Sequence, residues 1–225
     1  MSRASCRSRS RGSSAANASA PRRGSAGRCR QTSARRRAAS VPDDFYDKIK
    51  ARLYRRIGEE ISGAQRVVDI GCGGCELARF LAEACEHNVT GVDIKDGAFP
   101  DHDGLPKHVR QRLRCIKADG QSLDFLEDGT VDAITAVWAV HEMAEPGAVL
   151  AEARRVLRPG GELVIVDFPR DSLAQRLWHE HYYDPREMGR MLERTGFDDV
   201  SSRLIEREQV IWAKGFRPSQ KEAVG

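Results

Sequence analysis

Between residues 45 and 61, apolar residues recur every four positions, with charged residues between them. The apolar positions are Phe45, Ile49, Leu53, Ile57 and Ile61. This spacing places them on one face of a helix, so we expect an amphipathic helix that begins after Pro42. A short apolar run over 66–70, a glycine-rich turn and a second helical pattern from Leu77 to Cys85 follow. The folded part of the chain therefore opens as helix, strand, loop and helix.

The alternation of strand and helix patterns continues along the chain. Further strands are expected over 88–94, 114–118, 131–137 and 162–168, and further helices over 105–113, 148–157 and 184–194. Strands that alternate with helices are typical of a parallel sheet covered on both faces. The strand patterns at 200–206 and 209–215 have almost no connection between them, which only an antiparallel hairpin allows. We predict a doubly wound α/β fold with a mostly parallel sheet and a C-terminal antiparallel hairpin.

The composition changes near residue 40. Residues 1–40 hold 11 Arg and 10 Ser but no Asp, Glu or aromatic residue, so they have too little apolar surface to offset the entropy of ordering them. We expect a disordered tail over 1–40, one folded domain over 41–218 and a short tail over 219–225. Without those 11 Arg, 26 basic residues remain against 33 acidic ones, which is a net charge of −7. The folded domain is therefore not expected to bind nucleic acid.

No segment has the apolar length of a secretory signal or of a membrane span. We expect a cytoplasmic protein, with an organelle as the alternative, because an Arg-rich, Ser-rich N-terminus without acidic residues also fits a transit peptide. The 6 Cys show neither a secreted disulfide framework nor a paired zinc spacing, so reduced thiols are expected. Cys72 and Cys75 form a C-x-x-C inside the glycine-rich turn, and we interpret them as small loop residues.

The glycine-rich turn carries the strongest chemical signal. Gly71 and Gly73 let the backbone turn tightly and approach a ligand, and the next helix offers free N–H groups at its start. Asp93 ends the second strand 22 positions after Gly71, a place from which a carboxylate binds ribose hydroxyls. Together these residues predict an adenosine-type ligand. A dinucleotide fingerprint needs glycine at the position of Glu76, whose carboxylate would repel a pyrophosphate, so NAD is the less favoured ligand.

Four stretches, in the right order, resemble the class I S-adenosylmethionine-dependent methyltransferases, in particular the small-molecule group akin to the quinone-biosynthesis methyltransferases. They cover 67–75, 91–93, 118–119 with 123–132, and 156–163. The resemblance spans nearly the whole folded region. It implies a Rossmann-like, seven-stranded sheet and S-adenosylmethionine as the cofactor.

The resemblance assigns the turn after the first strand to the amino-acid part of that cofactor. Gly71 and Gly73, with Cys72 between them, would pack against this part of the cofactor. Asp69 would lie near the ammonium group of the cofactor or the loop N–H groups. The family usually has a third glycine where this chain has Cys75, which implies a slightly wider loop or a shifted cofactor.

The later strand ends are assigned to the rest of the cofactor. By the same resemblance, Asp93 would hold the ribose and Ile94 would contact the adenine face. Asp119 with Gly120 would contact the amino edge of the adenine. Val137, at the end of the fourth strand, would line the methionine side.

Candidate catalytic residues follow the fourth strand, at the sheet edge where open α/β folds bind ligands. Either His141 or Glu142 can act as a general base on an acceptor, and the alternative is that His141 only shapes the pocket. The segment 178–184 holds two His and an Asp, but we interpret it as a substrate lid and predict no metal site. Tyr46 and Tyr54 on the first helix either close over the sulfonium or pack in the core.

Methyl transfer to a small molecule is the expected function, because a sulfonium is an activated donor and the protein need mainly align the acceptor. The acceptor atom (O, N, C or S) and the oligomeric state stay open. One alternative is a cofactor-binding relative without turnover that serves as a partner protein, and a less favoured one is an NAD-dependent oxidoreductase. The Arg-rich tail adds a further alternative, a tether to RNA or to a membrane surface.

Overall fold

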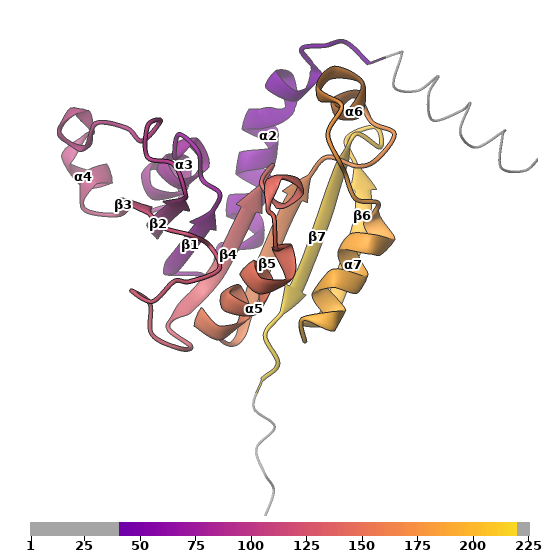
Figure 1. The fold of residues 1–225 in the computed structure, drawn as a ribbon. Coiled ribbons are helices and arrows are strands. Elements are labelled where there is room, and N and C mark those ends of the chain that lie inside the picture. The colour runs from indigo at the N-terminus through magenta and orange to yellow at the C-terminus, as the bar shows by residue number, and fades with distance from the viewer. Residues whose placement is uncertain (1–40, 220–225) are drawn as a thin grey trace, which may run out of the picture.

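The computed structural model describes residues 41–219 and contains one seven-stranded sheet with helices on both faces (Figure 1). The strands are β1 (Arg66–Ile70), β2 (Asn88–Asp93), β3 (Leu113–Lys117), β4 (Val131–Val137), β5 (Leu157–Asp167), β6 (Asp198–Ile205) and β7 (Val210–Phe216). The helices are α2 (Phe45–Glu60), α3 (Glu76–Ala84), α4 (Lys107–Arg110), α5 (Pro146–Val156), α6 (Leu173–Trp178) and α7 (Pro185–Arg194), with the 3-10 turns η1 (His102–Gly104) and η2 (Val140–Glu142). The tails expected over 1–40 and beyond 219 lie outside the described residues.

The strand order is β3-β2-β1-β4-β5-β7-β6. Strands β1 to β5 are parallel, and β7 pairs antiparallel with both β5 and β6. The chain moves outward from β1 to β3 and then returns to place β4 on the other side of β1, so the order reverses between β1 and β4. Such a reversal opens a crevice at the carboxyl ends of the strands. The predicted doubly wound, Rossmann-like α/β sheet with its C-terminal antiparallel hairpin is confirmed.

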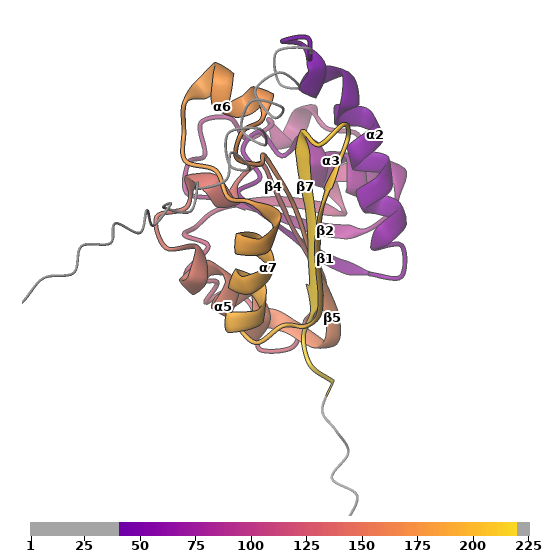
Figure 2. The same cartoon turned by 90° about the vertical axis from the view of Figure 1, so that its right-hand side faces the viewer.

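Neighbouring residues of each central strand are buried on opposite faces of the sheet, as the pleat requires. Val67 packs in the cluster under α2 and α3, whereas Val68 packs in the cluster under α5 and α7. Figure 2 shows these two helix pairs on opposite sides of the sheet. Burial on both faces explains why β1 and β4 read as continuous apolar runs. No helix among residues 41–219 is long and apolar enough to cross a membrane.

Three elements differ from the sequence-based expectation. Strand β5 begins at Leu157 rather than at residue 162, because Val131 of β4 already pairs with Leu157 and a bulge absorbs the residues that follow. Helix α4 is a single turn, because Leu113 already pairs with Val89 in the β2–β3 ladder. Helix α6 was not expected, since its 6 residues are too few to show a helical period.

Candidate active site

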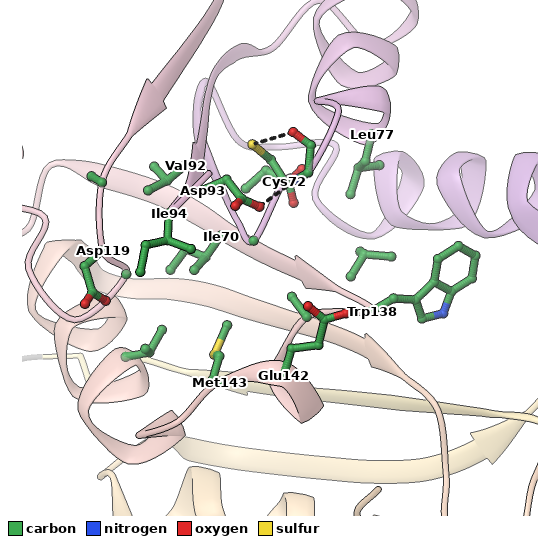
Figure 3. Close-up of a pocket in the computed structure, with 18 of the residues that line it drawn as sticks. Ile70, Cys72, Leu77, Val92, Asp93, Ile94, Asp119, Trp138, Glu142 and Met143 are labelled. Carbon is green, nitrogen blue, oxygen red and sulfur yellow. Dashed lines mark hydrogen bonds between the residues drawn. The ribbon is translucent and has the colours of Figure 1, made fainter. Parts of the chain in front are cut away.

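A cavity of about 490 Å³ lies at the carboxyl ends of the central strands, where the strand order reverses (Figure 3). Its volume is in the range of pockets that enclose small molecules and cofactors. The predicted site residues that line it are Asp69, Gly71, Cys72, Gly73, Asp93, Ile94, Asp119, Gly120, Val137 and Glu142. His141 lies outside this lining.

The glycine loop approaches the end of β4 very closely. Gly71 has φ 71°, and a Cβ atom added to it would lie 2.4 Å from the Cβ of Ala139. Gly73 also has a positive φ, 50°, and open space around it. Cys75, which stands where the resembling family usually has glycine, adopts φ 57° as the N-cap residue of α3. The loop therefore keeps a left-handed backbone at all three positions, although only two are glycine.

Asp93 connects the end of β2 to the glycine loop (Figure 3). Its Oδ2 atom accepts a hydrogen bond from the backbone N–H of Gly73 at 2.8 Å, and its Oδ1 atom accepts one from Lys95 N–H at 2.9 Å. A carboxylate oxygen can accept more than one hydrogen bond. Asp93 is thus held rigidly at the cavity wall and can still accept hydrogen bonds from the hydroxyls of a ribose.

Asp69 is a carboxyl group buried at the base of the cavity, with an exposed fraction of 2%. Its Oδ1 atom accepts a hydrogen bond from Thr135 Oγ1 at 2.7 Å. Burial raises the pKa of Asp69 to about 7, the Thr135 hydrogen bond opposes this rise, and the charge of Asp93 adds to it. A positive ligand group near Asp69 would favour its charged form. This end of the cavity therefore suits a cationic group such as an ammonium.

Ile94 and Asp119 lie at the other end of the cavity from Trp138 (Figure 3). Ile94 is 63% exposed, so its apolar side chain is free to cover a flat ring. Asp119 accepts a hydrogen bond from Gln121 N–H at 2.9 Å, which fixes the turn that follows β3. A Cβ atom at Gly120 would lie 3.0 Å from Ile70 Cγ2, so glycine keeps this turn close to the end of β1.

Trp138 follows β4 in a left-handed conformation with φ 54°, which is rare for a bulky side chain. Its ring stacks on Phe168 with a centroid distance of 5.3 Å and an interplanar angle of 9°. Its indole Nε1 is buried without a hydrogen-bond partner among the described residues. Backbone strain of this kind clusters at functional sites, and Trp138 lines the cavity.

The two tyrosines of α2 have different surroundings. Tyr46 is buried away from the cavity, where its hydroxyl donates to the carbonyl of Gln209 at 3.3 Å and accepts from Ala174 N–H at 3.1 Å. Tyr46 therefore packs in the core, which was one of its two expected roles. Tyr54 lines the cavity, where burial raises its pKa and the nearby charge of Glu76 adds to the rise. That Tyr54 faces the sulfonium of a bound cofactor stays a prediction.

His141 is held by a buried carboxylate at the end of β5. Its side chain is 4% exposed, and its Nδ1 atom lies 2.7 Å from Asp167 Oδ1. The backbone N–H of His141 also donates to Asp167 Oδ2 at 3.0 Å. Two contacts with one carboxylate fix both the position and the ring orientation of His141. Its other nitrogen, Nε2, is directed toward the carboxylates of Glu142 at 3.9 Å and Glu180 at 3.4 Å.

Three carboxylates surround this single imidazole. Burial lowers the pKa of His141, but the hydrogen bond and charge of Asp167 and the charges of Glu142 and Glu180 outweigh it, so the net pKa is raised. The ligand atoms of His141, Glu142 and Glu180 all lie within 4.8 Å of one another. The site can therefore hold a positive charge, either as a proton on Nε2 or as a cation between the three groups.

The segment 178–184 does not gather its own polar side chains into a site. Asp184 caps α7 and accepts hydrogen bonds from Arg186 N–H and Glu187 N–H at 2.8 and 2.9 Å. His179 and His181 are absent from the one metal-competent group found among residues 41–219. The segment instead contributes Glu180, which approaches His141. Its role as a substrate lid stays a prediction.

Three cysteines meet beneath the glycine loop. The Sγ atoms of Cys72 and Cys75 are 3.4 Å apart, and the Sγ atom of Cys75 is in contact with that of Cys115 of β3. The fold thus brings together two cysteines that are 40 positions apart in the chain, and the expectation of reduced thiols stays a prediction. Gly91 leaves room for the sulfurs, since a Cβ there would lie 3.0 Å from two of them. Burial raises the pKa of the Cys72 thiol to about 12, so it is not a thiolate nucleophile at neutral pH.

Asp167 and Glu180 were not predicted as site residues from the sequence. Asp167 carried a usable signal, because it is an acidic residue that ends an apolar strand at the ligand-binding edge of a parallel sheet. Glu180 carried none, since it lies in an irregular segment. Lys50 of α2 was also missed; it lines the cavity and forms an ion pair with Glu76.

Comparison with known proteins gives a family match over the site. Residues 68–165 match the model of a family described as a methyltransferase domain. This range runs from β1 through β5 and so includes the glycine loop, Asp93, Asp119 and the His141–Glu142 pair.

Two curated relatives and one solved structure are similar to the chain. The 27-O-demethylrifamycin SV methyltransferase of Amycolatopsis mediterranei is 32% identical over 54% of this chain and 43% of its own length. The ubiquinone/menaquinone biosynthesis C-methyltransferase of Teredinibacter turnerae is 32% identical over 56% of this chain and 54% of its own length. The match therefore spans about half the length of these relatives. The crystal structure of a SAM-dependent methyltransferase from Aquifex aeolicus superposes with a TM-score of 0.58 and 21% sequence identity. The match covers 72% of the present chain and 88% of the Aquifex protein, and it shows a shared fold.

Proposed function

We propose that the chain is a class I S-adenosylmethionine-dependent methyltransferase that methylates a small molecule by in-line displacement, since residues 68–165 match a methyltransferase-domain family and the similar curated relatives are methyltransferases. The observation that carries the proposal is a single cavity with two different ends. One wall holds the glycine loop, Asp69 and Asp93, and Trp138 and Glu142 line the far end, which we assign to the acceptor. A cofactor bound along the wall would present its reactive group toward the second end.

The cavity wall fits the chemical groups of S-adenosylmethionine. The left-handed turn at Gly71 gives the backbone close access to a ligand, and the buried carboxyl of Asp69 suits the ammonium of the methionine part. Asp93 has free acceptor capacity for the ribose hydroxyls, and exposed Ile94 offers an apolar surface to the adenine. Asp119 and Gly120 would contact the edge of that base.

The chemistry places few demands on the protein. When bound, S-adenosylmethionine supplies a methyl group on a sulfonium that is already activated for displacement. The chain holds an acceptor in line with that methyl group and keeps water away, and alignment of this kind supplies about 7–11 kcal/mol in favourable cases. Trp138, stacked on Phe168, forms a rigid apolar wall for this purpose, and Tyr54 faces the same space.

Proton handling is assigned to the pair that follows β4. Glu142 lines the cavity and is exposed to it, so its carboxylate is placed to take a proton from an acceptor. His141 lies behind Glu142 and is oriented by Asp167. The pair is needed only for acceptors whose nucleophilic atom carries a proton that must leave. The acceptor atom itself, O, N, C or S, stays open in this proposal.

A transfer assay tests the proposal. The full chain is incubated with S-adenosylmethionine carrying a labelled methyl group and a panel of phenols, hydroxyquinones, amines and thiols, and label is followed into product. Transfer to at least one acceptor, lost in Asp93→Ala, supports the proposal. Binding of the cofactor without transfer to any acceptor would favour a catalytically silent partner protein.

The site of action is proposed to be the cytoplasm, with an organelle as the alternative. Imaging of tagged chains with and without residues 1–40 distinguishes the two, because an organellar signal that disappears with those residues would contradict a cytoplasmic location.

A further inference from the structure

We propose that His141, Glu142 and Glu180 bind a divalent transition-metal ion beside the acceptor end of the cavity, where Glu142 lines it. One nitrogen and two carboxylate oxygens from these residues lie within 4.8 Å of one another. A metal ion bound about 2.0–2.2 Å from each ligand keeps those ligands about 3–4 Å apart. The group therefore needs only small side-chain rotations to close on an ion. Glu142 and Glu180 are exposed, and Glu180 also accepts a hydrogen bond from the Tyr182 hydroxyl at 3.3 Å on the same Oε2 atom.

The imidazole is already oriented as metal-binding histidines are. Nδ1 of His141 is 2.7 Å from Asp167 Oδ1, and the His141 side chain is 4% exposed. Histidine ligands of metals commonly donate their second ring N–H to a carboxylate, which fixes the tautomer and makes the ligating nitrogen more basic. Asp167 supplies that carboxylate from the end of β5, an element that contributes none of the three ligands.

The arrangement is incomplete without a positive group on Nε2. If Nδ1 carries the proton shared with Asp167, Nε2 presents a lone pair to two carboxylates, at 3.4 Å from Glu180 and 3.9 Å from Glu142. Nε2 forms no well-aligned hydrogen bond within the described part of the chain. Within residues 41–219, the only ion-pair partner found for Glu142 and Glu180 is His141 itself. A lone pair and two unneutralised carboxylates facing one another favour a cation between them.

The ligand types indicate which cation. Carboxylates alone suit Mg²⁺ and Ca²⁺, whereas imidazole suits Zn²⁺, Fe²⁺ and related ions, so a mixed nitrogen and oxygen set favours a transition metal such as Mn²⁺ or Zn²⁺. An ammonium group would instead donate hydrogen bonds to the Nε2 lone pair and to the two carboxylates.

The position gives the ion a role in methyl transfer, and this part of the inference rests on the proposed function. Glu142 belongs both to the metal group and to the cavity lining. An ion held there would bind the acceptor oxygen and lower its pKa, so that a nucleophilic oxyanion forms near neutral pH. His141 and Glu142 would then act by holding the ion, and the acceptor oxygen would lose its proton to solvent.

Metal binding is measured directly, without turnover. The full chain is titrated with Mn²⁺, and the free ion is followed by electron paramagnetic resonance, with a parallel calorimetric titration using Zn²⁺. We expect saturable binding of one ion that is weakened about 10–100-fold in Glu180→Gln and in Asp167→Asn, the loss seen when a metal ligand or its supporting carboxylate is removed. Glu193→Gln on α7 removes the same charge from an exposed residue outside the group and should bind Mn²⁺ as the parent does.

Two results would overturn the metal site. One is the absence of saturable Mn²⁺ and Zn²⁺ binding in the parent chain, which would leave Nε2 to be protonated. The other is binding that stays equally tight in Glu180→Gln and Asp167→Asn. S-Adenosylhomocysteine is titrated into the same preparations, and its failure to bind would count against the proposed function rather than against the metal site.

Discussion

The buried carboxyl of Asp69 makes the stability of the protein depend on pH in a direction opposite to that of an ion-paired aspartate. Its pKa rises from an ordinary value of 3.8 to about 7, chiefly because of burial. The folded protein therefore keeps this proton up to about pH 7, whereas the unfolded chain releases it near pH 4. Because the folded state binds more protons between these values, the free energy of unfolding falls as pH rises from about 4 to about 7 and then levels off.

The size of the effect follows from the difference between the two pKa values. At about 1.4 kcal/mol for each pKa unit, the cost of the charged carboxyl above pH 7 is about 4 kcal/mol. Typical domains have about 5–15 kcal/mol of total stability, so this cost is a large share. Asp69→Asn removes the charge and keeps an oxygen that can accept the hydrogen bond from Thr135. We expect the variant to be more stable than the parent at pH 8, and close to the parent at pH 4.

Urea unfolding of both proteins, followed by circular dichroism at several pH values from 4 to 8, measures this difference. The pKa of His141 is also raised, so protonation of His141 stabilises both proteins at low pH, and this stabilisation is lost as the pH rises through that pKa. Comparing the variant with the parent cancels this shared contribution. A constant difference between the two proteins across the whole range would refute the reasoning, because it would mean that Asp69 does not titrate between pH 4 and 8.

Three further predictions concern the glycine loop, its anchor and the core. Asp93→Ala removes the carboxylate that accepts a hydrogen bond from Gly73 N–H. Because a lost charged hydrogen bond costs about 1.5–3 kcal/mol, we expect the affinity for S-adenosylhomocysteine, measured by calorimetry, to fall about 10–100-fold. Unchanged affinity would show that Asp93 is not part of the cofactor site. Gly71→Ala puts a methyl group 2.4 Å from the Cβ of Ala139 at a positive φ, so a loss of at least about 1–3 kcal/mol is expected in urea unfolding, and a neutral result would contradict the close approach. Leu53→Ala empties a fully buried position of α2 and should cost about 2–5 kcal/mol by the same assay, whereas a change below about 1 kcal/mol would show that α2 is not packed on the sheet.

The fold was predictable from the sequence because its signals are local and repeated. The four-residue spacing of α2 and the apolar runs of β1 and β4 follow directly from burial on one face of a helix and on both faces of a strand. The hairpin of β6 and β7 follows from the short connection between them. The length of α4 and the start of β5 were wrong, because cross-strand pairing determines them and a single segment does not reveal its partners.

That Asp69, the glycine loop and Asp93 line one cavity was predictable for a related reason, since they sit at fixed places relative to β1 and β2. The surroundings of His141 were not, because Asp167 and Glu180 reach it from elements that are 26 and 39 positions away in the chain. The contact between Cys75 and Cys115 was missed for the same reason, since it depends on the packing of α3 over β2 and β3.

The most direct test of the cofactor assignment is calorimetric titration of the full chain with S-adenosylmethionine, S-adenosylhomocysteine and NAD in parallel. The glycine loop, the carboxylates of Asp69 and Asp93, and Glu76 at the start of α3 predict that the first two bind at one site and that NAD does not. Binding of NAD without binding of either S-adenosyl compound would contradict the account.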